Sequence, residues 1–240
     1  MITGVAFCPH PPVLIPDLAV GAADELATLR EHALNAIRSV DSVSSRLVLL
    51  GSAPGSSVHS PLARGSFAGF GVGLEVSLGS DACGGALELP LSLSVGAWLV
   101  RAAIGARSAT SAFSAGRDFV RSRAAAELVR VATEEQVGLV VMGDGSARRT
   151  PAAPGYVDDR AVAFDDAVLA ALRDGNADAL AALDPDLADE LLVAGASAWR
   201  GAGHLLGGAA WRSTTTELFD PFGVAYPLAV WEPTDGADTG

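Results

Sequence analysis

Short apolar runs alternate along the chain with segments whose apolar residues are spaced by three and four. A compact apolar run bounded by turn formers is typical of a buried strand, and two such runs around a tight turn predict a hairpin. The predicted strands cover residues 2–8, 46–50, 71–78, 137–142, 214–219 and 224–231. The last two flank the turn Asp220 to Gly223 and predict an antiparallel pair that closes the fold.

Helical periodicity lies between these runs. Predicted helices cover residues 21–40, 91–104, 159–173, 178–192 and 196–206, and Val120, Ala124, Leu128 and Val131 mark one further helical face. Asp24 and Glu25 suit the positive N-terminal end of the first helix. Residues 51–66 are rich in turn formers and predict a long irregular loop, a kind of segment that often carries function.

The alternation of strands with helices predicts an α/β fold. We expect a single domain over residues 1–232, with a central sheet, mostly parallel or mixed, flanked by helices on both faces. The closing antiparallel pair favours the mixed form. Residues 233–240 are polar and predict a C-terminal tail.

Composition narrows the classes of function. The net charge is −12, and all 16 basic residues are Arg, so no segment can neutralise a run of phosphates. This excludes a nucleic-acid partner and disfavours an anionic membrane surface. The apolar start of the chain has no basic region and is broken by prolines, which is not a signal peptide. With two cysteines and no CxxC motif, the expected location is the cytoplasm.

His10 gives the strongest local signal for chemistry. It directly follows the first predicted strand and lies among Pro9, Pro11 and Pro12, which would hold the ring still. Ligands of open α/β sheets bind at the carboxyl ends of strands, so His10 is a candidate metal ligand or catalytic group. The alternative is a histidine that caps a turn by hydrogen bonding.

Two further side chains could join His10. His59 lies in the loop after the second strand and could share a metal site with His10, although a solvent-exposed loop histidine is the alternative. Asp144 follows the strand at residues 137–142 and could bind a metal, orient a histidine, or simply stabilise a turn. Ser52 near His59 could be imagined as a nucleophile, but the spacing does not favour it. His204 is the remaining candidate imidazole, although a lone histidine in an apolar helix is more often a core residue.

With these pieces placed, the chain resembles the subunit-B-like class III extradiol ring-cleavage dioxygenases, the LigB-type superfamily that also includes Memo-like proteins. Residues 10–17, HPPVLIPD, which end in Asp17, are similar to the family's N-terminal HPP segment. VLLGSAP at 48–54 is similar to its second strand and turn, and VVMGDGSARR at 140–149 to its SGDLSH segment. Gly155-Tyr156 and Phe164-Asp165 match the GY and FD that follow in the family. The closing residues 192–210 and 222–227 are similar to the closing helix and strands of an actinobacterial subgroup.

The resemblance implies roles for several residues, and the sequence also departs from the family pattern at some of its site positions. It implies that His10 is the first Fe(II) ligand and that Asp144 and Ser146 are framework residues of the site. The family's second ligand histidine has no counterpart in the turn 51–54, and Ala147 stands where the acid/base histidine belongs. The third ligand has no clear match, and Glu190 is out of register.

Two classes of function remain open. One is a divergent non-haem oxygenase that acts on a small aromatic diol, with Fe(II) or another divalent metal at His10 and His59. The other is a non-catalytic relative, without a cofactor, that binds a small molecule or a partner in the same pocket. We expect the pocket to include Asp17, Ser52, Asp144, Ser146 and His204. A homo-oligomer, or a separate small subunit that completes the site, is compatible with the sequence.

Overall fold

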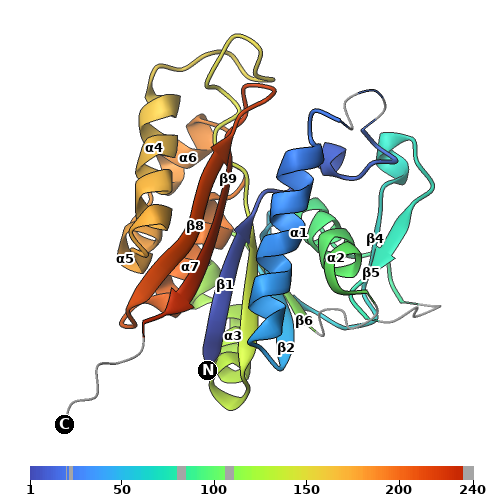
Figure 1. Ribbon diagram of the computed structural model, residues 1–240, viewed down its shortest axis with the longest axis vertical. Coiled ribbons are helices and arrows are strands. Elements are labelled where there is room, and N and C mark those ends of the chain that lie inside the picture. Colours follow the sequence, from blue (N-terminus) through green and yellow to red (C-terminus); the bar gives the residue numbers. More distant parts are fainter. Residues whose placement is uncertain (20, 22–23, 80–84, 106–110, 235–240) are drawn as a thin grey trace.

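The computed structural model describes residues 1–19, 21, 24–79, 85–105 and 111–234. They form an α/β fold with one seven-stranded mixed sheet covered by helices on both faces, as predicted (Figure 1). The strand order is β3-β6-β2-β7-β1-β9-β8. The four inner strands β6, β2, β7 and β1 run parallel, and β3, β9 and β8 pair antiparallel.

The strands of this sheet are β1 (Ile2–Cys8), β2 (Arg46–Ser52), β3 (Ser57–His59), β6 (Ser111–Ala115), β7 (Val137–Met142), β8 (Trp211–Phe219) and β9 (Tyr226–Pro233). A separate two-stranded sheet pairs β4 (Arg64–Ser66) with β5 (Glu75–Ser77). Three short 3-10 helices lie at Pro12–Leu14, Ala68–Phe70 and Phe119–Arg121.

The helices form two layers. The layer of α1 and α2 covers one face, and that of α3, α4, α5 and α7 covers the other (Figure 1). Their bounds are α1 (Ala27–Ser42), α2 (Leu91–Ile104), α3 (Arg123–Glu134), α4 (Arg160–Arg173), α5 (Ala177–Ala181), α6 (Pro185–Glu190) and α7 (Ala196–Leu206). Among the described residues, none of these helices has the length and apolar character needed to cross a membrane.

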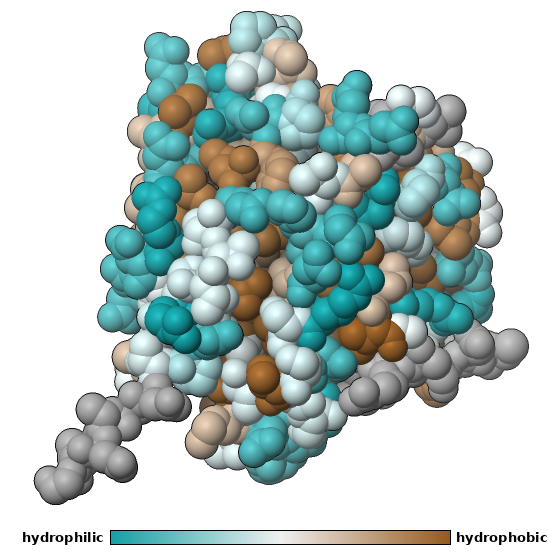
Figure 2. All heavy atoms as spheres, in the orientation of Figure 1, coloured by the Kyte–Doolittle hydropathy of each residue, from teal (hydrophilic) through white to brown (hydrophobic). Residues whose placement is uncertain are grey.

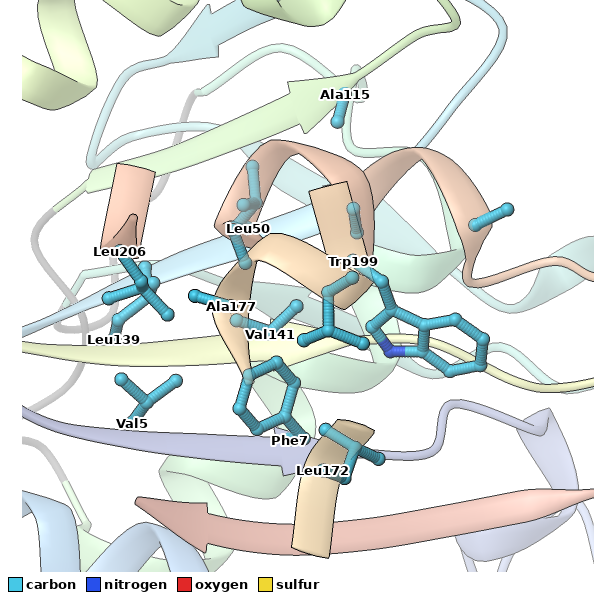
Figure 3. Packing of buried hydrophobic residues seen from close by; sticks show 14 of the residues in the cluster. Val5, Phe7, Leu50, Ala115, Leu139, Val141, Leu172, Ala177, Trp199 and Leu206 are labelled. Atoms are coloured by element: carbon cyan, nitrogen blue, oxygen red, sulfur yellow. The ribbon is translucent and has the colours of Figure 1, made fainter. Parts of the chain in front are cut away.

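Both faces of the sheet are buried, which explains why the inner strands are continuously apolar. Phe7 of β1 packs into the layer of α4 and α7, while its neighbour Ala6 packs toward α1 and α2. Figure 3 shows Phe7, Val141 and Trp199 in the first of these clusters. The Phe7 and Trp231 rings meet edge to face with centroids 4.8 Å apart, and the Trp231 indole N–H donates to the carbonyl of Leu172 at 2.6 Å.

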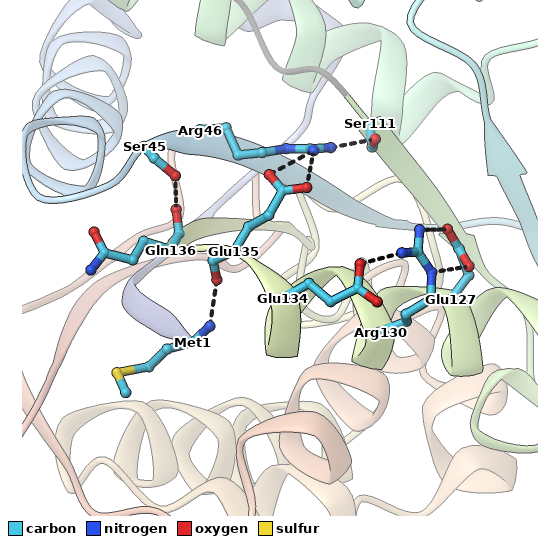
Figure 4. Close-up of polar contacts among 9 residues, drawn as sticks. All are labelled: Met1, Ser45, Arg46, Ser111, Glu127, Arg130, Glu134, Glu135 and Gln136. Carbon is cyan, nitrogen blue, oxygen red and sulfur yellow. Dashed lines mark hydrogen bonds and ion pairs between the residues drawn. The ribbon is translucent and has the colours of Figure 1, made fainter.

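The amino ends of the parallel strands are fastened by polar contacts (Figure 4). Arg46, which begins β2, donates to both carboxylate oxygens of Glu135 at 2.8 Å and to the Ser111 hydroxyl at 2.7 Å. The amino group of Met1 donates to the Glu135 carbonyl. These contacts join the starts of β1, β2, β6 and β7, and the candidate residues His10 and Asp144 lie at the opposite end of the sheet.

Some predicted elements differ from the structure. The segment 51–66 is not one irregular loop, because it contains β3 and β4. The first helix begins at Ala27 rather than 21, so Asp24 and Glu25 precede it. The predicted helix 178–192 is split into α5 and α6, since Asp184 caps a new helix and Pro185 starts it. The predicted tail begins later, because Pro233 ends β9; residues 235–240 and Cys83 lie outside the described residues.

A tight contact between α2 and the sheet gives a first prediction. A Cβ on Gly96 would lie 2.5 Å from Leu49 Cδ2 and 3.0 Å from Met142 Cγ. Alanine is ordinarily the better helix former by about 1 kcal/mol, but overpacking a core costs about 1–3 kcal/mol. We expect Gly96→Ala to lower the free energy of unfolding in urea. The control is Gly69→Ala, where nothing lies within 4 Å of the added Cβ and no loss is expected. Equal stability of the two variants would contradict this packing.

Candidate functional site

The candidate site lies at the carboxyl ends of β1 and β7. In their parallel ladder Cys8 pairs with Met142, so His10 and Asp144, each two residues further on, come level with each other. Pro11 and Pro12 then start a 3-10 turn directly after His10. The local sequence therefore stops β1 sharply and places the two side chains at one point of the sheet edge.

His10 and Asp144 are in direct contact. The backbone N–H of His10 donates to Asp144 Oδ1 at 2.7 Å, and His10 Nδ1 lies 3.6 Å from the same oxygen. The two residues are 6% and 8% exposed. Within the described part of the chain, the buried Nδ1 of His10 has no hydrogen-bond partner. A buried polar atom left unpaired costs free energy, so this nitrogen is the unsatisfied polar atom of the candidate site.

Tyr226 completes the polar cluster. It begins β9, which runs antiparallel to β1 and thereby brings its first residue to the carboxyl end of that strand. Burial raises the pKa of the Tyr226 phenol, and the charge of Asp144 raises it further. Burial likewise raises the pKa of Asp144, while His10 opposes that shift through its charge and its N–H. Burial in this site therefore disfavours the charged form of both acids relative to the same groups in water.

The loop behind Asp144 is held by buried hydrogen bonds. Ser146 is fully buried; its N–H donates to Asp165 Oδ1 at 2.9 Å and its hydroxyl donates to the Leu191 carbonyl at 2.8 Å. Arg149 donates to the other oxygen of Asp165 at 3.1 Å. All the hydrogen-bonding groups of Ser146 are thus used within the protein, which makes it a framework residue, in line with the expectation from the sequence.

Gly143 allows helix α7 to approach the site. A Cβ there would lie 2.5 Å from Trp199 Nε1 and 2.9 Å from the Cα of Gly195. The Gly195 N–H donates to the Asp144 carbonyl at 2.7 Å, directly before the first turn of α7. The helix N-terminus, with its positive dipole end, is therefore fixed to the strand end that carries Asp144.

The structure does not bring His59 to His10. His59 lies on β3 at the edge of the sheet, and β6, β2 and β7 separate it from β1. Four strand spacings amount to about 19 Å. The expectation that His10 and His59 share one metal site is therefore wrong. His59 is 7% exposed rather than on the surface, its Nε2 has no partner among the described residues, and burial lowers its pKa against the opposing charge of Glu88.

The other expected pocket residues lie elsewhere or are already occupied. The Ser52 hydroxyl accepts the Ala198 N–H at 3.0 Å, and its carbonyl accepts the Ser92 hydroxyl at 2.7 Å, so Ser52 fastens α7 and α2. Asp17 is exposed. Both expectations for His204 are wrong. It is exposed rather than in the core, and it lies far from the pocket residues, in a groove with Met1 and Ile2 at the opposite end of β1 from His10.

The donors present do not fit an Fe(II) site. A two-histidine-one-carboxylate centre needs three donors around one point, and His10 with Asp144 supplies two. Among the described residues no group of three or more His, Cys, Asp or Glu side chains could hold a metal ion. The Ser146 hydroxyl donates to the Leu191 carbonyl and accepts the Arg148 N–H, so it adds no free oxygen to this pair.

Sequence reasoning did not select Tyr226, Asp165 or Arg149 as site residues. All three stand in or beside segments that resemble the extradiol family, yet their roles depend on contacts between distant segments. Tyr226 could have been found from its place at the start of the closing strand, because an antiparallel neighbour of β1 must begin level with the residues that follow β1.

No protein-family model matches the chain, and no curated protein matches it either. The resemblance to the extradiol dioxygenases therefore stays a prediction from the residues quoted above.

The raised pKa of Asp144 gives a prediction of pH dependence. The folded state holds this proton more tightly than the unfolded state, so the free energy of unfolding falls as pH rises from the usual pKa of 3.8 through the folded-state pKa. Asp144→Asn keeps an oxygen that can accept the His10 N–H but removes the charge. We expect the variant to be more stable than the wild type at neutral pH, with the difference vanishing near pH 3, in urea unfolding measured across pH.

Asp158 provides a control of opposite sign. Hydrogen bonds from Arg160 lower its pKa to about 2, so it stabilises the fold above the ordinary Asp pKa and loses this effect as pH falls. Asp158→Asn should therefore be no more stable than the wild type at neutral pH. A loss of stability in Asp144→Asn at neutral pH would show instead that the ionised carboxylate is favoured by its contact with His10.

Proposed function

We propose that this protein binds a small aromatic diol at His10 and Asp144, without cleaving it, as a non-catalytic relative of the extradiol dioxygenase fold. The observation that carries the proposal is the buried His10 ring nitrogen that has no hydrogen-bond partner, 3.6 Å from a carboxylate oxygen. Preorganised, unpaired polar atoms at the carboxyl end of parallel strands are typical of ligand sites.

The two side chains favour a ligand that brings hydrogen-bond donors. A carboxylate only accepts, and one nitrogen of a neutral imidazole accepts as well. Two adjacent hydroxyls on one ring present two donors at a spacing that suits two acceptors 3.6 Å apart. Tyr226 adds a phenol whose raised pKa keeps its proton at neutral pH, and which can donate to a ligand oxygen.

The surroundings favour a ring. Ala147 and Phe222 are partly buried against the same hydrophobic cluster as Val224 and Tyr226. Where the extradiol family has an acid/base histidine, this chain has the methyl group of Ala147. An apolar contact in that position suits binding of the aromatic face and leaves ring cleavage without its expected proton-transfer group.

The two available donors also favour ligand binding over oxygenase chemistry. Ring cleavage with O₂ needs a bound metal with open positions, and His10 with Asp144 offers two donors. The binding proposal uses the same residues as acceptors and requires nothing else. A cytoplasmic location, as expected from the sequence, fits a protein that handles a small soluble metabolite.

Isothermal titration with catechol tests the proposal. We expect saturable one-to-one binding to the wild type, and at least a tenfold loss of affinity, about 1.4 kcal/mol, in His10→Ala. His59→Ala is the matched control, because it also removes a buried histidine with an unpaired nitrogen, at the far edge of the sheet. It should bind catechol as the wild type does.

Two results would overturn the proposal. Equal loss of binding in both histidine variants, or none in either, would place the ligand elsewhere. Stoichiometric iron retained after anaerobic loading and desalting, together with consumption of catechol in air, would establish the oxygenase in its place.

A further inference from the structure

Strand β8 forms a long, uncovered edge of the sheet. It is the outermost strand, next to β9, and none of its residues from Arg212 to Phe219 is buried. Figure 1 shows it along one side of the sheet, and Figure 2 shows a band of pale, weakly polar side chains on that face. Apart from the pairing with β9, no backbone-to-backbone hydrogen bond from residues 212–219 is found in the described part of the chain.

The two edges of the sheet differ in how they are protected. The opposite edge, β3, has three residues, and a short strand is a common way to prevent pairing with other chains. Strand β8 has nine residues and no Pro, and its two charged residues, Arg212 and Glu217, are of opposite sign. Its centre is Ser-Thr-Thr-Thr, which is rich in β-branched residues that favour a strand.

The irregular pairing at Thr214 decides on which face of the sheet each β8 side chain lies. The pairing with β9 skips Thr214, because Ser213 pairs with Trp231 and Thr215 with Val230. Directly opposed residues point to the same face, so Thr215 and Glu217 share the α1 face with Val230 and Leu228. Arg212 is opposite Glu232 and lies on this face too, while Ser213 and Thr216 lie on the other. The skipped residue thus puts Arg212 and Glu217, five positions apart, on one face.

We propose that β8 pairs antiparallel with β8 of a second copy of this chain to form a two-fold dimer with one continuous sheet. With Thr214 left unpaired, as it is against β9, the two-fold axis passes where Thr215 lies opposite its own copy. Arg212 then lies opposite Glu217 of the second copy, and Ser213 lies opposite its Thr216. Each of these pairs shares a face, as an antiparallel ladder requires. A two-fold interface must be self-complementary, and this register of β8 meets that condition.

Charge complementarity supports the same register. Arg212 is 65% exposed at its side chain and Glu217 34%, and each already has a partner on its own chain, Glu232 at 2.9 Å and His32 at 2.6 Å. A guanidinium has five donors, so Arg212 can hold Glu232 and the second copy's glutamate together. The two-fold axis produces this Arg–Glu contact twice.

A charge-swap experiment tests the register. Arg212→Glu places two glutamates opposite each other in a homodimer, and Glu217→Arg places two arginines opposite each other, so each variant alone should be monomeric. An equimolar mixture restores both opposite-charge pairs and should form a heterodimer. Sedimentation velocity from about 1 to about 100 µM measures this, with a rise of the dissociation constant of at least about a hundredfold expected for each single variant. Arg123→Glu, the same charge change at an exposed position on α3, is the control and should dimerise as the wild type does.

Every outcome decides the proposal. A wild type that is monomeric over this range, or variants that both still dimerise, would overturn it, and so would single variants that fail to associate when mixed. Hydrogen exchange of the wild type gives an independent measure without any substitution. The β8 amides should become more protected as the protein concentration rises, and protection independent of concentration would contradict the interface.

Discussion

The hydrogen bond from the His10 N–H to the Asp144 carboxylate is the contact on which the geometry of the carboxyl end of the sheet depends. It joins the two central parallel strands directly after their last paired residues. The Asp144 carbonyl then holds the start of α7 through Gly195, and the next turn of the loop binds Asp165 through Ser146. One short segment after β7 therefore connects the sheet, the helix layer and the candidate site.

The sequence could predict those elements whose signal is local. The strands at 2–8 and 137–142 are continuous apolar runs, and the helix at 91–104 matches α2 residue for residue. Strand β6 was not predicted, because Ser111–Ala115 reads SAFSA, with small and polar residues in a strand that is nonetheless buried. Its backbone pairs with β2 and β3, which lie far from it in the sequence, and helices α3 and α7 pack on its side chains.

The site could be predicted only in part for the same reason. His10 and Asp144 each follow an apolar strand, which marks both as candidates, but their proximity depends on β1 and β7 being neighbours in the sheet. His59 follows an apolar strand too, but its loop folds into β3 and carries it to the far edge of the sheet. Only the three-dimensional pairing separates the histidine that belongs to the site from the one that does not, and it also adds Tyr226.

The state of the His10 ring tests the central claim most directly. The protein has four histidines, so their imidazole nitrogens can be resolved and assigned by ¹⁵N NMR with single substitutions. Addition of catechol should shift the ring nitrogens of His10 and leave those of His32, His59 and His204 unchanged. Unchanged His10 signals at saturating catechol, or His10 and His59 shifting together when a divalent metal is added, would contradict a metal-free ligand site at His10 and Asp144.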